Sequence, residues 1–466
     1  MATYSPAMTA ADALLWNIEQ DPVLRSTITA VALFDRAPDW DRLVAKLTRG
    51  ALDVPRLRQT VVLPPFGLGP PEWVDDPGFD LGYHLRRVRA PALGTLRSAL
   101  DIAEPLSMAG FDRTRPLWEF TLIEGLEGGQ AALLQKLHHS IADGVGGIRL
   151  AAAMLDLERD VTTEATVLPT ATATSAADLA ARSVLRQVRG VARAAGRAPG
   201  VLGAAAVSAS RNPMATMTGA AAMASSVARM LAPASGPTSP LLAGRTLGRR
   251  FDVLEVPLDA LKDAAHDADC TLNAAFLAAV VGGAARYHAK HGVVVEDVRL
   301  DMPVNLRAEG DPEGGNRFAP TRFRLPMGID DLAARMRAVG AIADRWRAEP
   351  ALTITDFLAG ALNALPRPVT TGIFGSMLKG VDVTITNIPG IPVETYIAGA
   401  QVVREWALAP PSGAAISVSL VSHVDTACIG VTCDTGAVRD VDGFVACLVD
   451  GFDEVLAGRA ETRLRS

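Results

Sequence analysis

Two adjacent histidines, His138 and His139, end an apolar run and are followed by Asp143 and Gly144. Imidazole titrates near neutral pH, so a histidine here can act as a general base that takes a proton from a hydroxyl group. Asp143 can orient an imidazole or cap the helix that follows, and Gly144 allows backbone or substrate to approach closely. The pattern therefore predicts acyl transfer to a hydroxyl with a histidine as base.

Other chemistry is open to the same residues. A histidine is more often structural than catalytic, and a histidine pair with an aspartate can bind a metal. The other five histidines and the four cysteines form no complementary cluster, so we expect no metal site. The sequence contains no G-x-S-x-G element, so it does not indicate a serine hydrolase. The glycines after Asp143 do not complete the G-x-G-x-x-G pattern of dinucleotide binding.

Helices and strands alternate irregularly on both sides of a long segment rich in Ala, Thr, Ser, Gly and Pro. This order predicts an α/β fold with mixed sheets, in which a first domain (1–160) and a second domain (249–466) are joined by a partly helical linker (161–248). Hydrophobic periodicity and capping residues predict helices over 9–19, 144–157, 271–290 and 441–456, and strands over 27–34, 118–123, 131–137, 298–304, 381–385, 416–421 and 427–433.

Charge is distributed unevenly along the 466 residues. The net charge of −6 argues against nucleic acid as a partner. Between Asp178 and Asp252, however, the chain has ten arginines and no acidic residue. The first five, Arg182 to Arg197, recur every three or four residues and predict a basic amphipathic helix, with Val184 and Val188 on the opposite face. Such a helix can lie on an anionic membrane surface; alternatively, it packs on acidic groups of the protein itself.

The N-terminus has no signal-peptide pattern, and no run of about 20 strongly apolar residues predicts a membrane span. The four cysteines lack disulfide or zinc spacing and are expected to be reduced and mostly buried. We therefore expect a cytoplasmic protein that associates peripherally with the inner face of the membrane or with lipid bodies.

The H-H-x-x-x-D-G run at 138–144 resembles the signature of the CoA-dependent acyltransferase superfamily. Further segments, in the right order along nearly the whole chain, resemble the bacterial wax ester synthase/acyl-CoA:diacylglycerol acyltransferase family: Ser5-Pro6 through Asp12, Pro116-Leu117-Trp118-Glu119, Thr271-Leu272-Asn273, Pro303-Val304 with Gly315-Asn316-Arg317, and Asn387-Ile388-Pro389-Gly390. The chain departs from the family pattern at Ala274 (commonly Asp), Asn305 (Ser) and His423 (Tyr).

The resemblance implies two domains like that of chloramphenicol acetyltransferase, with His139 as general base, His138 in support and Asp143 in a structural role. The substrates would be a long-chain acyl-CoA and a diacylglycerol or long-chain alcohol, with no covalent acyl-enzyme and no cofactor. Asn273 is the candidate oxyanion donor, with Gly144 helping to position the substrate; alternatively, Asn273 only caps its helix. Pro116, Leu117 and Trp118 would line or brace the substrate pocket.

A chain with one such motif is expected to act as a monomer, with its second half supplying the opposite wall of the tunnel. Two other functions are compatible with the sequence. One is a condensation-type or small-molecule acyltransferase that uses the same histidine. The other is a non-enzymatic lipid-binding or lipid-body protein, for which the basic linker would suffice.

Overall fold

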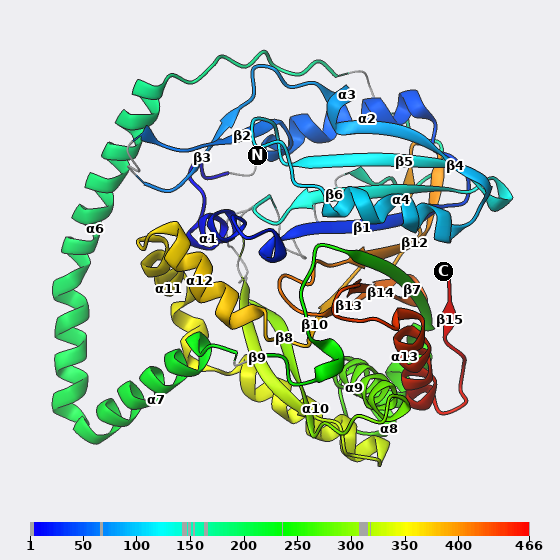
Figure 1. Cartoon of the computed structure of the whole chain (residues 1–466). Helices are drawn as coiled ribbons and strands as arrows, with labels where there is room; N and C mark the ends of the chain where they lie inside the picture. Colours follow the sequence, from blue (N-terminus) through cyan, green and yellow to red (C-terminus); the bar gives the residue numbers. More distant parts are fainter. Residues whose placement is uncertain are drawn as a thin grey trace.

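The computed structural model describes residues 4–65, 69–141, 147, 151, 154–162, 166–234, 236–306, 316 and 318–465. Two mixed β-sheets form the centre of an α/β structure, and Figure 1 shows the first sheet above the second. Most of the predicted helix over 144–157 lies outside the described residues, as do Asp143 and Gly144.

The first sheet has the strand order β11-β12-β1-β6-β5-β4. Strand β1 is antiparallel to β6, and their register places Thr27 opposite His138, the last residue of β6. Strands β4 and β5 are parallel, which makes the sheet mixed. The strands are β1 (Thr27–Phe34), β4 (Leu85–Gly94), β5 (Trp118–Leu126), β6 (Ala131–His138), β11 (Tyr396–Ile397) and β12 (Ala400–Leu408). A separate hairpin pairs β2 (Gln59–Val62) with β3 (Glu72–Asp75).

The second sheet has the order β15-β7-β14-β13-β10-β8-β9. Strand β10 is parallel to β8 and β13, whereas the other neighbours are antiparallel. The strands are β7 (Arg249–Pro257), β8 (Asp297–Asn305), β9 (Phe318–Pro326), β10 (Val383–Ile388), β13 (Ile416–His423), β14 (Thr426–Asp434) and β15 (Arg463–Leu464). The predicted mixed sheets in both halves are confirmed.

Two strands of the second half, β11 and β12, belong to the first sheet. Strand β12 pairs antiparallel with the edge of β1, and the buried Trp406 on β12 donates from Nε1 to the main-chain oxygen of Leu254 on β7. The predicted domain start at residue 249 assigns both strands to the second domain, so the sequence does not predict this exchange of strands between the halves. An alternating pattern of apolar and polar residues predicts a strand but not the sheet that it joins. The exchange ties the two halves together beside the site described below.

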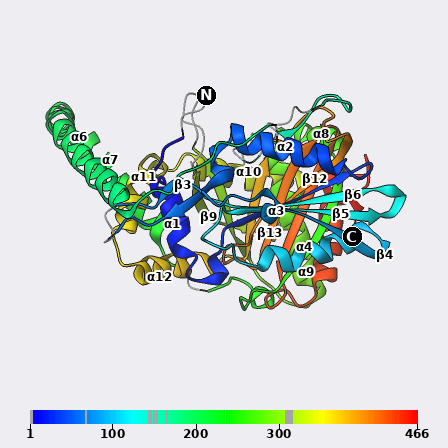
Figure 2. The same ribbon diagram turned by 90° about the horizontal axis from the view of Figure 1, so that it is seen from above.

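Helices cover the outer faces of both sheets and fill part of the space between the halves (Figures 1 and 2). Helix α4 contacts the first sheet and β7, while α8, α9, α10 and α13 share one hydrophobic core with the second sheet. Helices α1, α11 and α12 meet in a smaller core formed by both halves. Their bounds are α1 (Ala10–Ile18), α2 (Trp40–Asp53), α3 (Leu81–His84), α4 (Leu96–Met108), α8 (Leu258–Asp267), α9 (Leu272–Lys290), α10 (Leu332–Arg347), α11 (Thr355–Asn363), α12 (Arg367–Leu378) and α13 (Val441–Leu456).

The linker contains two helices, α6 (Ala176–Arg211) and α7 (Pro213–Leu231). Helix α6 stands at the side of the molecule, and α7 returns to the body below it (Figure 1). Near its start α6 is held by Glu72 of β3, whose Oε1 accepts from Ser183 Oγ at 2.7 Å and from Arg186 Nη1 at 2.9 Å. One of the predicted surface arginines therefore pairs with an acidic group of the protein itself.

Candidate active site

His138 is a buried residue at the end of β6, with 2% of its side chain exposed. The main-chain N–H of Ser140 lies 3.0 Å from Nδ1 and donates to it, so Nδ1 is an acceptor and the ring proton is on Nε2. That nitrogen lies 3.0 Å from Oε1 of Glu19. Both ring nitrogens of His138 thus face groups inside the protein, and its supporting role stays a prediction.

Glu19 follows the last residue of α1 and is also held by other groups. Its Oε1 accepts from the main-chain N–H of Ser26 at 2.9 Å, and its Oε2 lies 3.3 Å from Nη2 of Arg113. Burial by itself raises the pKa of Glu19, but the attraction of His138 and these donors outweigh it, so the pKa lies below its ordinary value. The carboxylate therefore stays charged next to His138.

We expect Glu19→Gln to lower the free energy of unfolding by about 1–3 kcal/mol near neutral pH, because it removes the negative charge of a buried group that faces His138 and Arg113. A carboxyl with a lowered pKa stabilises the fold above its ordinary pKa, and this stabilisation is lost as the pH falls through the pKa of the folded protein. Unfolding curves of both proteins should therefore differ at pH 7 and converge below about pH 4.5. A difference that is constant over this range would show that the charge of Glu19 contributes nothing.

His139 is the next residue, and its ring is fixed by Asn316 from the second half of the chain. The amide nitrogen Nδ2 of Asn316 donates to the main-chain oxygen of His139 at 2.7 Å and to Oδ1 of Asp12 at 2.6 Å. These two acceptors set the amide orientation, so its oxygen faces Nδ1 of His139, at 2.7 Å. An amide oxygen only accepts, so Nδ1 carries the proton and Nε2 has the lone pair. Nε2 of His139 is therefore the atom that can take a proton.

Asp12 completes this chain of hydrogen bonds. It is 2% exposed, and its Oδ1 accepts from both the main-chain N–H and Nδ2 of Asn316. Its Oδ2 accepts from the N–H of Thr9, whose hydroxyl accepts from the N–H of Asp12, so the predicted cap of α1 is confirmed as a capping box. Burial raises the pKa of Asp12, although the hydrogen bonds from Thr9 and Asn316 oppose this.

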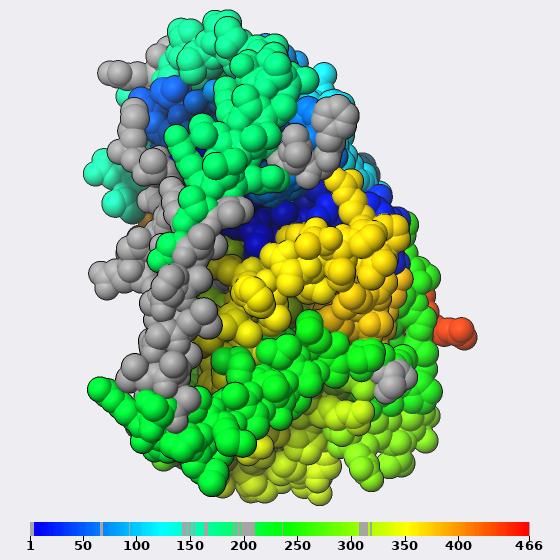
Figure 3. Space-filling view, turned by 90° about the vertical axis from the view of Figure 1, so that its left-hand side faces the viewer, coloured from blue at the N-terminus to red at the C-terminus, as the bar shows by residue number. Residues whose placement is uncertain are grey.

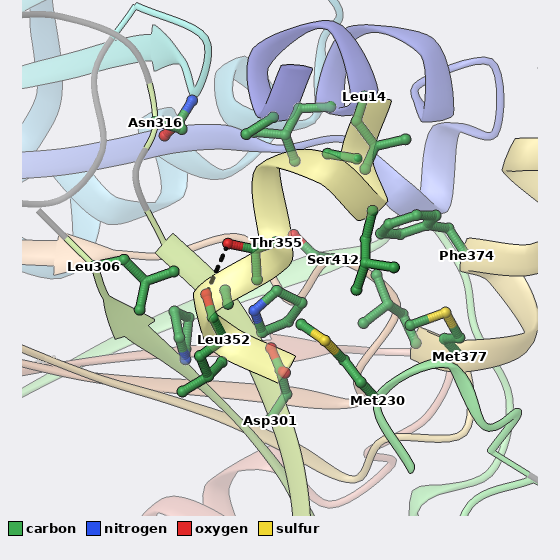
Figure 4. A pocket seen from close by; sticks show the side chains of 18 of the residues that line it. Leu14, Met230, Asp301, Leu306, Asn316, Leu352, Thr355, Phe374, Met377 and Ser412 are labelled. Carbon is green, nitrogen blue, oxygen red and sulfur yellow. Dashed lines mark hydrogen bonds between the residues drawn. The ribbon is translucent and has the colours of Figure 1, made fainter. Parts of the chain in front are cut away.

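A cavity of about 640 Å³ lies beside His139. His139, Ser26 and helix α1 line it from the first half, and the end of α7 lines it from the linker. Strands β8 and β10 and helices α11 and α12 line it from the second half, which thus supplies the opposite wall as the sequence predicted. Its helical wall is mostly apolar: in Figure 4, Leu14, Phe374 and Met377 lie on one side of the view, and Asn316 lies on the other. A hydrocarbon chain fits such a wall.

Asn273 is not brought to this cavity. It lies in the first turn of α9, a helix that packs against α8, α10 and α13, and it is not among the cavity-lining residues. The hydroxyl of Thr271 caps the helix by accepting from the N–H of Ala274 at 3.2 Å. Neither the oxyanion role nor the capping role considered for Asn273 is therefore supported.

Leu117 and Trp118 are fully buried, and Pro116 is buried beside them. None of the three lines the cavity. Instead the main-chain oxygen of Leu117 accepts from the N–H of His138 at 2.9 Å, and the Trp118 ring stacks on His84 at a centroid distance of 4.7 Å. They brace the strand that carries the histidines, and the prediction that they line the pocket is not supported.

Among the described residues, no group of three or more His, Cys, Asp or Glu side chains is arranged to hold a metal ion. All four cysteines are free thiols, and Cys428, Cys433 and Cys447 are buried. The chemistry that the described groups around His139 allow is proton transfer to and from its Nε2 atom.

Sequence profiles of known families cover most of the chain. The wax ester synthase/diacylglycerol acyltransferase catalytic domain matches residues 8–276, and the C-terminal domain of the same family matches residues 314–455. The chain belongs to the wax ester synthase/diacylglycerol acyltransferase family. This acyltransferase family was the one that the motifs indicated, and its two profiles include His139 and Asn316, respectively.

Curated relatives agree with this membership. A putative diacylglycerol O-acyltransferase of Mycobacterium tuberculosis strain H37Rv is 38% identical over 449 residues, which cover 96% of this chain and 91% of the relative. A probable diacylglycerol O-acyltransferase of the same strain, tgs1, is 29% identical over 434 residues, with 90% and 89% of the two chains covered. The protein is an acyltransferase of this family.

Solved structures share the fold. The wax ester synthase/diacylglycerol acyltransferase of Marinobacter aquaeolei VT8 is 21% identical and has a TM-score of 0.61 over 96% of this chain and 98% of that chain. The first condensation domain of the calcium-dependent antibiotic synthetase is 16% identical, with a TM-score of 0.63 over 99% of each chain. At these identities the likeness concerns the fold, and the predicted two-domain acyltransferase architecture is confirmed.

Proposed function

We propose that this acyltransferase moves a long-chain acyl group from acyl-CoA to the hydroxyl of a diacylglycerol, of a long-chain alcohol, or of both. His139 takes the hydroxyl proton at Nε2 while the oxygen attacks the thioester carbonyl. The tetrahedral intermediate collapses, the carbon–sulfur bond breaks, and the thiolate takes the proton back from His139 and leaves as CoA. No bond forms between the acyl group and the protein.

The observation that carries this proposal is the position of His139 on the wall of an apolar cavity with its Nδ1 hydrogen-bonded to Asn316. The oxygen of Asn316 also stabilises the positive charge that His139 gains with the proton. Asn316 thus favours the proton-accepting tautomer and the protonated ring that follows. Leu14, Phe374 and their apolar neighbours provide a surface for hydrocarbon.

The test is to incubate purified protein with labelled palmitoyl-CoA and a panel of dipalmitoylglycerol, hexadecanol and small amines, and to separate the products by thin-layer chromatography. We expect labelled triacylglycerol, wax ester or both. Label in the amine products alone would favour a condensation-type or small-molecule acyltransferase. The absence of any product would favour the non-enzymatic lipid-binding alternative.

The linker favours a membrane surface or lipid body as the place of action, on the cytoplasmic side. Arg182 and Arg189 on α6 are exposed, and so are the apolar residues Val184, Leu185 and Val188, at 45%, 48% and 60%. Figure 3 shows α6 on the same face of the molecule as α11 and α7, which both line the cavity.

Among the described helices no single one is long and apolar enough to span a bilayer; α8 and α9 pass that test only as a pair bent by 96°. We therefore propose that the protein binds the membrane or lipid-body surface peripherally through α6. We also propose that it acts as a monomer.

We expect Arg182→Glu/Arg189→Glu to weaken binding to anionic vesicles by more than about 30-fold at low salt, because each basic residue near such a surface contributes about 1 kcal/mol. Flotation with vesicles of phosphatidylglycerol and phosphatidylcholine measures this. The matched control, Arg337→Glu/Arg345→Glu, makes the same charge change at exposed positions of α10. Equal loss in both variants, or no flotation of the unmodified protein, would contradict docking through α6.

A further inference from the structure

Asp301 is an acidic residue in the wall of the cavity. It is distant from His139 in the sequence and takes no part in the proposed proton transfer. It lies on β8, is 8% exposed and lines the same cavity as His139. On the sheet its partners are Arg322 of β9 and Thr384 of β10. In Figure 4 it lies at the lower centre of the view, with Leu352 and Met230 near it and Asn316 at the upper left.

One oxygen of the Asp301 carboxyl is not satisfied by the described neighbours. Within the part of the chain that the structure describes, its Oδ1 is buried and has no hydrogen-bond partner. The two arginines on this face of the sheet donate to main-chain oxygens instead. Arg299 donates to Gly236 and Gly380, and Arg322 donates to Met377 and Met230.

Burial raises the pKa of Asp301 to about 7, although the positive charge of Arg322 lowers it. At neutral pH and below, a large share of Asp301 is therefore a neutral carboxylic acid with an O–H to donate. A buried donor that finds no acceptor costs about 1–3 kcal/mol. A plain hydrocarbon chain in the cavity leaves it unpaired, whereas an uncharged oxygen of the ligand pairs it.

We infer that Asp301 is a positioning residue that donates a hydrogen bond to an uncharged oxygen of the lipid acceptor and thereby favours a glycerolipid over a plain long-chain alcohol. The ester carbonyls of a diacylglycerol supply such an oxygen in addition to the attacked hydroxyl, whereas hexadecanol has no second oxygen. The inference rests on the proposed function, because it assumes that the cavity receives the acceptor lipid.

Other titratable and charged groups also face this region. His139, Arg347, Glu349 and Asp356 line the cavity, and Arg299 and Arg322 flank Asp301 on the sheet. The ratio of kcat/KM for dipalmitoylglycerol to kcat/KM for hexadecanol isolates Asp301. Protonation of His139 as the base affects both acceptors alike and cancels in the ratio, whereas the Asp301 hydrogen bond exists with the diacylglycerol only.

The experiment measures this ratio between pH 5.5 and 8.5 for the wild type, Asp301→Leu and Asp301→Asn. In the wild type we expect the ratio to fall as the pH rises through about 7, because ionisation removes the donor. Asp301→Leu has similar size without a donor and should lower the ratio about 5- to 150-fold at pH 6. Asp301→Asn keeps an N–H donor that does not titrate, so its ratio should stay high and independent of pH.

A ratio unchanged in Asp301→Leu, or a pH-dependence that persists in Asp301→Asn, overturns the role of Asp301 while the proposed acyltransferase function stands. A wild type without activity on either acceptor overturns both. If Asp301→Leu does not fold, the pH-dependence of Asp301→Asn decides alone.

Discussion

Replacing His139 by alanine is expected to lower kcat by at least about 100- to 10,000-fold, which is the contribution of a positioned general base. The neighbouring His138 is not placed to replace Nε2 of His139, because it is buried, with its Nδ1 accepting from Ser140 and its Nε2 next to Glu19. The fold should persist, because the β6 backbone keeps its hydrogen bonds to β1. Labelled palmitoyl-CoA with each acceptor measures the loss, and thermal unfolding reports on the fold.

His266→Ala is the matched control, since His266 is an exposed histidine on α8, outside the cavity. It should keep wild-type turnover. Wild-type turnover in His139→Ala would instead overturn the general-base mechanism. A loss of activity that is accompanied by unfolding would show that His139 supports the fold, and the isosteric His139→Gln would then have to separate the two roles.

The elements around the histidines could be predicted because their signals are local. The capping box at Thr9, the β-branched run of β1 and the apolar strands β5 and β6 each lie within about ten residues of sequence. Helix α13 begins and ends where the periodicity predicts. The prediction that His139 is the base came from the motif in the same way, since both histidines and their flanking strand are contiguous.

The partners of His139 could not be predicted from spacing. Asn316 is 177 residues beyond His139 and 304 residues beyond Asp12, and its bonds to both depend on how the two halves pack. Asn316 and Asp12 lie in segments that resemble family motifs, but a motif does not show which side chains form hydrogen bonds with one another. The sequence favours Asn273 as the oxyanion donor because it is a polar residue at the start of an apolar helix, but residues that serve only the fold also occupy such positions.

The cavity and the linker show a similar limit. The apolar residues of α1, α11 and α12 look like ordinary core residues in the sequence, and only the arrangement of both halves leaves space between them. The basic periodicity of α6 predicted a helix correctly, yet it could not show that Arg186 turns to Glu72 while Arg182 and Arg189 remain exposed. Charge patterns indicate a surface but not its partner.

Replacing Asn316 by alanine is expected to lower kcat by about 10- to 150-fold, because a hydrogen bond to a charged group contributes about 1.5–3 kcal/mol. Without its oxygen, Nδ1 of His139 no longer has the acceptor that fixes the proton there. A share of the rings then carries the proton on Nε2, where it blocks the base. The loss should appear mainly in kcat and not in KM, since the stabilised state is the protonated ring of the transition state.

The Asp12 variants separate orientation from charge. Asp12→Asn keeps an oxygen that can accept from Asn316, so we expect a small loss of activity, with one hydrogen bond of the capping box removed. Because burial raises the pKa of Asp12, the folded protein loses stability as the pH rises from the ordinary pKa of an aspartate to this raised pKa, and Asp12→Asn removes this loss. Asp12→Ala leaves both donors of Asn316 without this acceptor and should lose activity nearly as Asn316→Ala does.

If Asp12 acts only through Asn316, the double variant Asp12→Ala/Asn316→Ala should be no less active than Asn316→Ala alone, because the second change removes a support that no longer has a function. Fully additive losses would show that Asp12 affects His139 by another route, such as the packing of α1 against the cavity. Comparison of kcat for the four proteins of this cycle, each checked by thermal unfolding, distinguishes the two. The predicted non-additivity follows from the geometry, in which the single amide of Asn316 contacts both the carboxylate of Asp12 and the imidazole of His139.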